Sequence, residues 1–486
     1  MRKFATITLL ALAVACRREM PVNATDTTSS ATTTATTSTT STTGSTTTST
    51  AASDRPPIVL SSKIPGDVTE ASIPPGSDRN QKLLLAQGDF DIYSWNTFIA
   101  LNWPPGPDGN GDPNKTIGQN GDNDTVWEHY RDVADIFLPG GAVPTWNGPE
   151  PNVPPECKAD YTAGTRIMTQ VGKTPNLLTV SENLQPFKTG PLIDQNGVFT
   201  RFQILVNKPM FDYILSNTLY SKAGQQVFSG QVKFPCGVLN GAEGAIMVKS
   251  AWKVIDPSEK SNFHSAQVLV YTPASTNPKY PASCKKQTVG LVGLHIGHKT
   301  NLGPQWLWST FEHIDNAPSE DDVASGKLKA KYNYYNPKCP PATCGANVIP
   351  PRPWIPNQVA SFHTQVVRMN MFKGGSEFAF TSAAERNADA LKLLVGVNPN
   401  SVWKNYELIS TMWPTNPGNG KCQASAVDTL GTPAPSFLAN TTLETYIQGP
   451  PLAPNVSSNC IECHNNATMT VGSKPSDFTY VLQRAK

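Results

Sequence analysis

The chain has 486 residues, and by length alone it could hold about three domains. Its 39 lysine and arginine residues nearly balance its 37 aspartate and glutamate residues, so no strong net charge exists to recruit nucleic acid. The 43 prolines and 35 glycines together outnumber the charged residues, which is typical of a loop-rich exported protein rather than a helical bundle.

The first 15 residues have the features of a secretory signal peptide. Arg2 and Lys3 precede an apolar run that is too short to span a membrane. The run ends in Ala13-Val14-Ala15-Cys16, which is similar to the lipobox of bacterial lipoproteins. We therefore expect residues 1–15 to be removed and Cys16 to carry a lipid in the bacterial cell envelope, in a periplasmic or outer-membrane-facing position. An ordinary cleaved signal with an incidental cysteine is the alternative.

Residues 16–56 are expected to be a lipid anchor followed by a disordered linker. Serine and threonine supply 21 of the 24 residues from Thr27 to Thr50, so this stretch has almost no apolar surface with which to form a core. A coil of about 40 residues spans on the order of 35 Å. The predicted role is to hold a globular domain away from the bilayer, and the lipid is the only expected contact with a membrane.

The nine cysteines divide into groups. Removing Cys16 for the lipid, and Cys460 and Cys463 for the reason given below, leaves an even number that permits three disulfides in an exported protein. Of these six, Cys339 and Cys344 are the best candidates for a local pair, because five residues can close a small loop. Buried free thiols are the alternative. The six residues are Cys157, Cys236, Cys284, Cys339, Cys344 and Cys422.

A C-x-x-C-H motif, Cys460-Ile461-Glu462-Cys463-His464, lies near the C-terminus. This is the attachment signature of a c-type haem. Two thiols three positions apart can add to the two vinyl groups of one porphyrin, while the next residue presents an imidazole to the iron. The motif therefore predicts one covalent haem c, with Cys460 and Cys463 as thioether anchors and His464 as the proximal iron ligand. A redox-active dithiol and a zinc site that borrows two further ligands are the alternatives.

The other axial position of the haem is not defined by the motif. Met469 is five positions from His464, too near to reach the opposite face, so the distal side must be empty or filled by the body. A short closing helix is expected from Ser476-Asp477 onwards, with Phe478 on its apolar face.

Residues 57–449 are expected to form one β-rich body, and residues 450–486 a haem-attachment segment docked on it. The stretch 90–103 is apolar at helical spacing and stops at a Pro-Pro pair, and a second helix is expected to start at Ser382. Between them, five segments show the alternation of β-strands. The predicted class is α+β: a large antiparallel β-rich body with flanking helices. The strand segments are 198–206, 245–255, 266–271, 289–298 and 305–313.

Histidines on the predicted strands are candidates for the distal position. His295 and His298 should point to opposite faces of one strand, so at most one of them faces a given pocket. His313, between two carboxylates, is the leading candidate for a distal iron ligand or pocket residue. For each of them, a hydrogen-bonded residue of the sheet is the alternative. Weaker candidates are His129, His264, His363, Met369 and Met371.

With these motifs in view, the chain resembles a group of largely uncharacterised bacterial cytochrome c-family proteins that are exported and carry one haem at a C-terminal CxxCH. The resemblance rests on three phrases in addition to Cys460–His464, and it spans most of residues 90–486. It implies a monohaem exported protein. The phrases are those at residues 94–104, 294–300 and 308–316.

We therefore expect a lipid-anchored c-type cytochrome that passes single electrons between redox partner proteins of the cell envelope. A haem enzyme of the peroxidase or oxygenase type, with an open distal site in the body, is the first alternative. A binding or scaffold lipoprotein is the second. The sequence defines neither catalytic residues nor a small-molecule substrate, since no nucleophile triad or phosphate loop is present.

Overall fold

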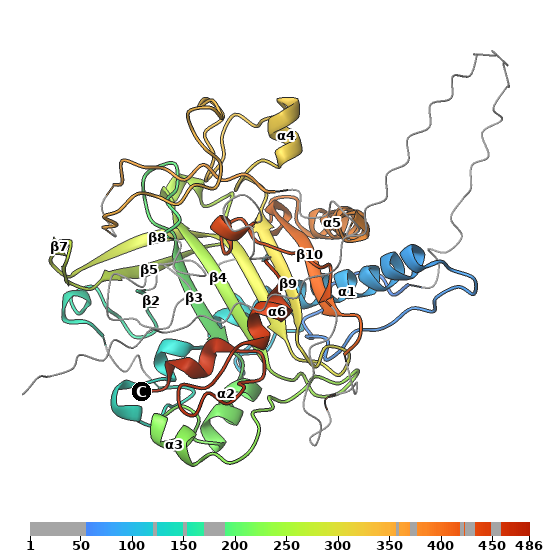
Figure 1. The fold of residues 1–486 in the computed structure, drawn as a ribbon, viewed down its shortest axis with the longest axis horizontal. Coiled ribbons are helices and arrows are strands. Elements are labelled where there is room, and N and C mark those ends of the chain that lie inside the picture. Colours follow the sequence, from blue (N-terminus) through green and yellow to red (C-terminus); the bar gives the residue numbers. More distant parts are fainter. Residues whose placement is uncertain are drawn as a thin grey trace, which may run out of the picture. The chain divides into compact units, whose positions relative to one another are not determined.

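The computed structural model describes residues 55–119, 124–148, 153–169, 190–355, 359–369, 377–417, 422, 433–448 and 458–486 (Figure 1). The expected signal peptide, Cys16, nearly all of the linker and Met371 lie outside these residues. In the described part, no helix combines the length and the apolar character that a bilayer crossing requires.

A sheet of nine strands forms the centre of the described part of the chain (Figure 1). Its main path runs β1-β3-β4-β8-β9-β10-β11, while β5 pairs with β8, and β2 pairs with β5. All pairs are antiparallel except β2 with β5. The α+β class with a large antiparallel sheet is thus confirmed. The strands are β1 (Arg131–Asp132), β2 (Ile167–Met168), β3 (Arg201–Val206), β4 (Ile246–Val254), β5 (Ser265–Thr272), β8 (Ser283–His298), β9 (Leu307–His313), β10 (Tyr406–Pro414) and β11 (Pro433–Ala434), with β6 (Ser275–Thr276) and β7 (Lys279–Tyr280) as a separate pair.

Six α-helices accompany the sheet in the described residues. The first begins earlier than its apolar pattern predicts, because Asp78 and Gln81 form a capping box ahead of that pattern. The helix that is predicted to start at Ser382 also begins earlier, because Ser382 lies inside a helix that starts at Glu377. The helices are α1 (Arg79–Leu101), α2 (Lys208–Ser216), α3 (Lys222–Val227), α4 (Glu320–Ser325), α5 (Glu377–Val397) and α6 (Cys460–Asn465).

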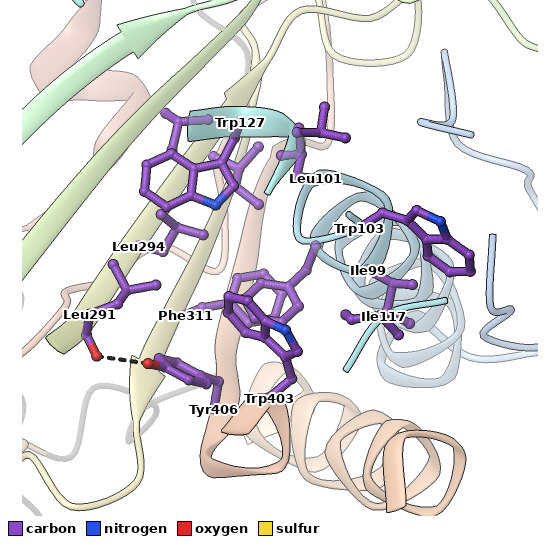
Figure 2. Packing of buried hydrophobic residues seen from close by; sticks show 14 of the residues in the cluster. Ile99, Leu101, Trp103, Ile117, Trp127, Leu291, Leu294, Phe311, Trp403 and Tyr406 are labelled. Carbon is purple, nitrogen blue, oxygen red and sulfur yellow. Dashed lines mark hydrogen bonds between the residues drawn. The ribbon is translucent and has the colours of Figure 1, made fainter. Parts of the chain in front are cut away.

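Helices α1 and α5 share a core with one face of the sheet (Figure 2). Phe98 of α1 stacks on Phe311 of β9 with ring centroids 4.3 Å apart, and Trp95 meets the same ring edge-on at 5.1 Å. Trp403 approaches Phe98 edge-on at 5.6 Å. Such aromatic contacts add to the free energy of burying the rings, so they attach α1 firmly to the sheet, while α5 joins the same core through Ala390 and Leu394.

The opposite face of the sheet packs against the C-terminal segment. Met247 of β4 and Trp308 of β9 share one core cluster with Ile461 of α6 and with Leu482, which lies in a 3-10 helix at Tyr480–Arg484. Because side chains alternate along a strand, the residues next to Met247 and Trp308 face the α1 side instead. The sheet therefore separates two cores, and the CxxCH segment belongs to the second one.

Three disulfides connect the six cysteines that the sequence sets aside as structural. They join Cys157 to Cys284, Cys236 to Cys422, and Cys339 to Cys344. The local pair is confirmed, and Cys460 and Cys463 are not part of a disulfide.

Candidate functional site

Helix α6 places the three residues of the CxxCH motif on one side of a single helical segment. Asn459 caps the helix, since its side-chain Oδ1 accepts a hydrogen bond of 3.0 Å from the Glu462 amide. Residues three and four apart on a helix are neighbours, so Cys460, Cys463 and His464 project together. Ile461, which lies between them, is fully buried against the sheet. The burial of Ile461 therefore sets the direction in which the two thiols point.

His464 is held in a defined orientation. Its Nδ1 lies 2.8 Å from the carbonyl oxygen of Phe478, so Nδ1–H donates and Nε2 carries the lone pair. The imidazole packs against Trp308, with ring centroids 4.2 Å apart, and against Tyr480 at 5.4 Å. The Tyr480 hydroxyl in turn donates to the Cys463 carbonyl at 2.7 Å. A fixed tautomer with Nε2 as the acceptor is the state that an iron-binding histidine requires.

The carbonyl that holds His464 belongs to an unusual turn. Asp477 and Phe478 both have positive φ, at 55° and 59°, a conformation that costs non-glycine residues free energy. Asp477 is anchored on both carboxylate oxygens: Lys299 Nζ lies 2.5 Å from Oδ1, and the Phe234 amide donates to Oδ2 at 2.7 Å. The expectation of a helix starting at Ser476-Asp477 is wrong, because this turn precedes the 3-10 helix at Tyr480–Arg484.

The motif opens onto a cavity of about 280 Å³ between α6, the C-terminal 3-10 helix and the sheet. The strand residues on its wall alternate along β4 and β8, as they must when they share one face of the sheet. Aromatic and aliphatic side chains make up much of the lining, together with a few charged groups. The lining residues are Ile204, Met247, Lys249, His295, Gly297, Trp308, Glu444, Ile447, Ser458, Asn459, Cys460, Cys463, His464, Tyr480, Val481, Gln483 and Arg484.

Lys249 and His295 lie side by side on the sheet wall of the cavity, as register partners on β4 and β8. Burial lowers the pKa of Lys249 to about 8; Cys460 acts in the opposite direction, and Arg484 lowers the pKa further. His295 Nε2 lies 3.1 Å from Glu444 Oε2. The cavity therefore holds cationic groups and a histidine–carboxylate pair within mainly apolar walls.

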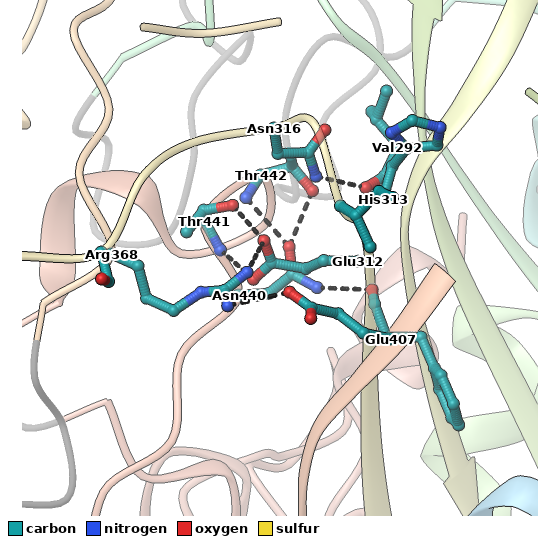
Figure 3. A network of polar contacts seen from close by, with 12 residues as sticks. Val292, Glu312, His313, Asn316, Arg368, Glu407, Asn440, Thr441 and Thr442 are labelled. Atoms are coloured by element: carbon teal, nitrogen blue, oxygen red, sulfur yellow. Dashed lines mark hydrogen bonds and ion pairs between the residues drawn. The ribbon is translucent and has the colours of Figure 1, made fainter. Parts of the chain in front are cut away.

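A polar network holds the segment that carries Glu444 (Figure 3). The Glu312 carboxylate of β9 accepts from the Thr441 amide at 2.7 Å and lies 3.0 Å from Arg368. Burial alone would lower the pKa of Arg368, but Glu312 and Glu407 raise it above its ordinary value. The network thus attaches residues 440–442 to the sheet beside the cavity and keeps Arg368 charged.

The other predicted histidines lie elsewhere. His298 points to the opposite face of β8 from His295, as expected, where it contacts the Tyr93 hydroxyl, and burial lowers its pKa to about 4. His313 Nε2 bonds to the carbonyl of Asn262 at 2.8 Å, and its ring stacks on Phe263. His313 does not line the cavity that Cys460, Cys463 and His464 border, so its position does not support a role as a distal iron ligand or pocket residue.

The weaker candidates are also separate from the cavity lining. His129 pairs with Asp124, and His264 Nε2 lies 3.0 Å from Glu128. Met469 is buried in the core beside the C-terminal segment, which agrees with the argument that it cannot reach a distal position. The weaker candidates His363 and Met369 are likewise not among the lining residues.

Sequence reasoning missed Lys249, Glu444 and Trp308 as residues of the site. The position of Lys249 could have been noticed in the sequence, because it is a charged residue in the middle of an apolar strand pattern from Ile246 to Trp252. The sequence contains no comparable sign for Glu444 and Trp308, because their place in the site depends on contacts between distant segments.

The residues present fit a covalently bound haem. The thiols of Cys460 and Cys463, which form no disulfide, line one largely apolar cavity with His464, whose Nε2 is oriented. Lys249 and Arg484, which also line it, could pair with the propionate carboxylates of a haem. Among the residues that the structure describes, no group of three or more His, Cys, Asp or Glu side chains is placed to hold a metal ion by itself.

In comparisons with known proteins, no family model, no curated protein and no solved structure matches the chain.

Proposed function

We propose that the protein is an exported, lipid-anchored c-type cytochrome that binds one haem through Cys460 and Cys463. The observation that carries the proposal is that the thiols of Cys460 and Cys463, which form no disulfide, line one cavity with His464, whose Nδ1 is fixed by the Phe478 carbonyl. When bound, the haem supplies an iron that takes up and releases one electron.

The chain's own residues would perform four tasks in this function. The thiols would fix the position of the porphyrin, and His464 would hold the iron through Nε2, with Nδ1 bound to the Phe478 carbonyl. Trp308 and Val481 would exclude water from the cavity that they line. Lys249 would place positive charge near the site of electron uptake, which would favour the reduced state. Redox proteins of the cell envelope are the expected partners.

The test is covalent haem attachment in a bacterial host that matures c-type cytochromes. The full chain should give a haem-stained band after denaturing electrophoresis and a mass increase equal to one haem. Changing both Cys460 and Cys463 to Ala should abolish the stain. The control is the double change of Cys339 and Cys344 to Ser, which removes a local disulfide and should leave the stain intact. Wild-type protein without covalent haem would rule the proposal out.

A haem enzyme is the second candidate, and one observation favours it. The cavity wall carries His295, Glu444 and Lys249, polar groups that could hold a proton or an anionic substrate beside a haem. Carbon monoxide binding to the reduced protein separates the candidates. Prompt binding indicates an open iron position and favours an enzyme, while a spectrum that does not respond favours electron transfer.

A further inference from the structure

Only two of the seven histidines line the cavity. All seven lie in the described part of the chain, and His295 and His464 are the two that do so. They come from different elements: His464 from α6, and His295 from the central strand β8. The fold thus brings a second imidazole to the same enclosed space, from a position 169 residues earlier in the chain (464 − 295).

The surroundings of His295 are those of a metal-binding histidine. Its Nε2 lies 3.1 Å from Glu444 Oε2, an ion-pair distance without the alignment of a hydrogen bond, so Glu444 places a carboxylate beside the imidazole. Glu444 is itself oriented, since the Asn440 amide donates to Oε2 at 2.9 Å. Asn440 is tied to β9 through its side-chain amide, which donates to the Phe311 carbonyl at 3.0 Å.

Two other potential iron ligands line the cavity, and the structure favours them less. Met247 is 2% exposed in the core cluster, and its sulfur accepts a contact of 3.8 Å from the Thr479 hydroxyl. Lys249 lines the cavity without an ion pair to a carboxylate of the described residues, whereas His295 lies 3.1 Å from Glu444. Among the three, only His295 has a carboxylate oxygen close to its ring, at 3.1 Å from Nε2.

We propose that His295 is the second axial ligand of the haem iron and that Glu444 is its positioning residue. This inference rests on the proposed haem site and deepens it, because it decides between the functions that the site allows. If His464 and His295 both held the iron, it could exchange electrons but would have no open position for a substrate. The large body would then have a defined contribution, because its central strand would supply one of the two ligands that the protein gives to the iron.

The experiment uses the full, haem-loaded chain and reads the iron coordination directly. Wild-type protein should show a low-spin electron paramagnetic resonance signal and no response to carbon monoxide. His295→Ala should become high-spin and bind carbon monoxide, and added imidazole should restore the low-spin signal. The control His129→Ala changes an exposed histidine that pairs with Asp124, and it should match the wild type.

Two further variants test the inference if His295→Ala folds poorly. His295→Met retains a ligand of a different type, so the midpoint potential should rise while the iron remains six-coordinate. Glu444→Gln keeps ligation but weakens the electron donation from the imidazole, so the potential should rise by a smaller amount.

The outcomes separate the two levels of the proposal. Missing haem in the wild-type chain defeats the proposed function itself and is seen first, by haem staining. Attached haem with prompt carbon monoxide binding in the wild type, or an unchanged axial signal in His295→Ala and His295→Met, overturns the assignment of His295 alone. If Met247→Leu instead changes the signal, the ligand is Met247 and the assignment is overturned in the same way.

Discussion

Lys249 and Lys253 lie four residues apart on strand β4, and their ammonium groups have different surroundings. Lys253 Nζ lies 3.7 Å from Asp194 Oδ2, and both side chains are buried. Lys249 instead borders the cavity, where burial lowers its pKa to about 8. A lowered pKa means that the folded protein disfavours the charged form, so Lys249 costs stability where Lys253 has a compensating partner.

We therefore expect Lys249→Met to stabilise the protein without haem. In the Cys460→Ala, Cys463→Ala background, the free energy of unfolding should rise by about 2 kcal/mol at neutral pH. Between pH 8 and the ordinary lysine pKa of 10.5, the unfolded chain binds more protons than the folded one, so the stability of the Lys249 protein rises with pH. The advantage of Lys249→Met should accordingly shrink over that window in urea unfolding curves.

Lys253→Met is the matched comparison on the same strand. It leaves Asp194 buried without its cation, so it should destabilise the protein by roughly 3 kcal/mol. If Lys249→Met and Lys253→Met destabilise the protein equally, the Lys249 ammonium is stabilised by a partner in the fold, and the prediction that its burial costs stability is wrong.

Among the elements, the C-terminal turn illustrates how tertiary contacts hold a conformation that the local sequence disfavours. Asp477 and Phe478 have left-handed backbone angles, and the Lys299–Asp477 ion pair connects this turn to the loop after β8. Both side chains of the pair are 2% exposed. The pair therefore fixes the carbonyl that orients His464.

Asp477→Asn tests this connection, because asparagine tolerates the left-handed conformation but removes the charge. Lys299 would remain a buried cation without its carboxylate, so we expect a loss of about 3–5 kcal/mol in the free energy of unfolding. Faster amide hydrogen exchange across residues 458–486 should accompany it. The double change with Lys299→Met should recover part of the loss. Unchanged exchange in Asp477→Asn would show that the turn does not depend on the pair.

The strands were predictable where the alternation of side chains is clear. Strands β3, β4, β8 and β9 alternate between the two cores, so their period of two is visible in the sequence. Strand β10 was missed, and its pairing with β9 is interrupted by a register shift between Leu408 and Ser410.

The CxxCH residues of the candidate site were predictable because their spacing is local. The opposite orientations of His295 and His298 also followed from the strand period. That His295 and not His313 faces Cys460 could not be known, because it depends on which face of the sheet the C-terminal segment covers. This choice is made by packing between distant parts of the chain, as with Ile461 against the sheet.

At the scale of the whole molecule, the proposed function implies that the expected lipid and linker would determine where electrons can be delivered. The net charge of +2 gives little long-range attraction to a partner, so encounters would depend on holding the domain at the membrane. We expect Cys16→Ser to move the protein from the membrane fraction to the soluble fraction, with haem staining unchanged because residues 458–486 are unaltered. Deleting residues 27–50 should keep the protein in the membrane fraction, and labelling with palmitate should persist. Wild-type protein found in the soluble fraction would show instead that the leader is cleaved without lipidation, and the linker would then need another role.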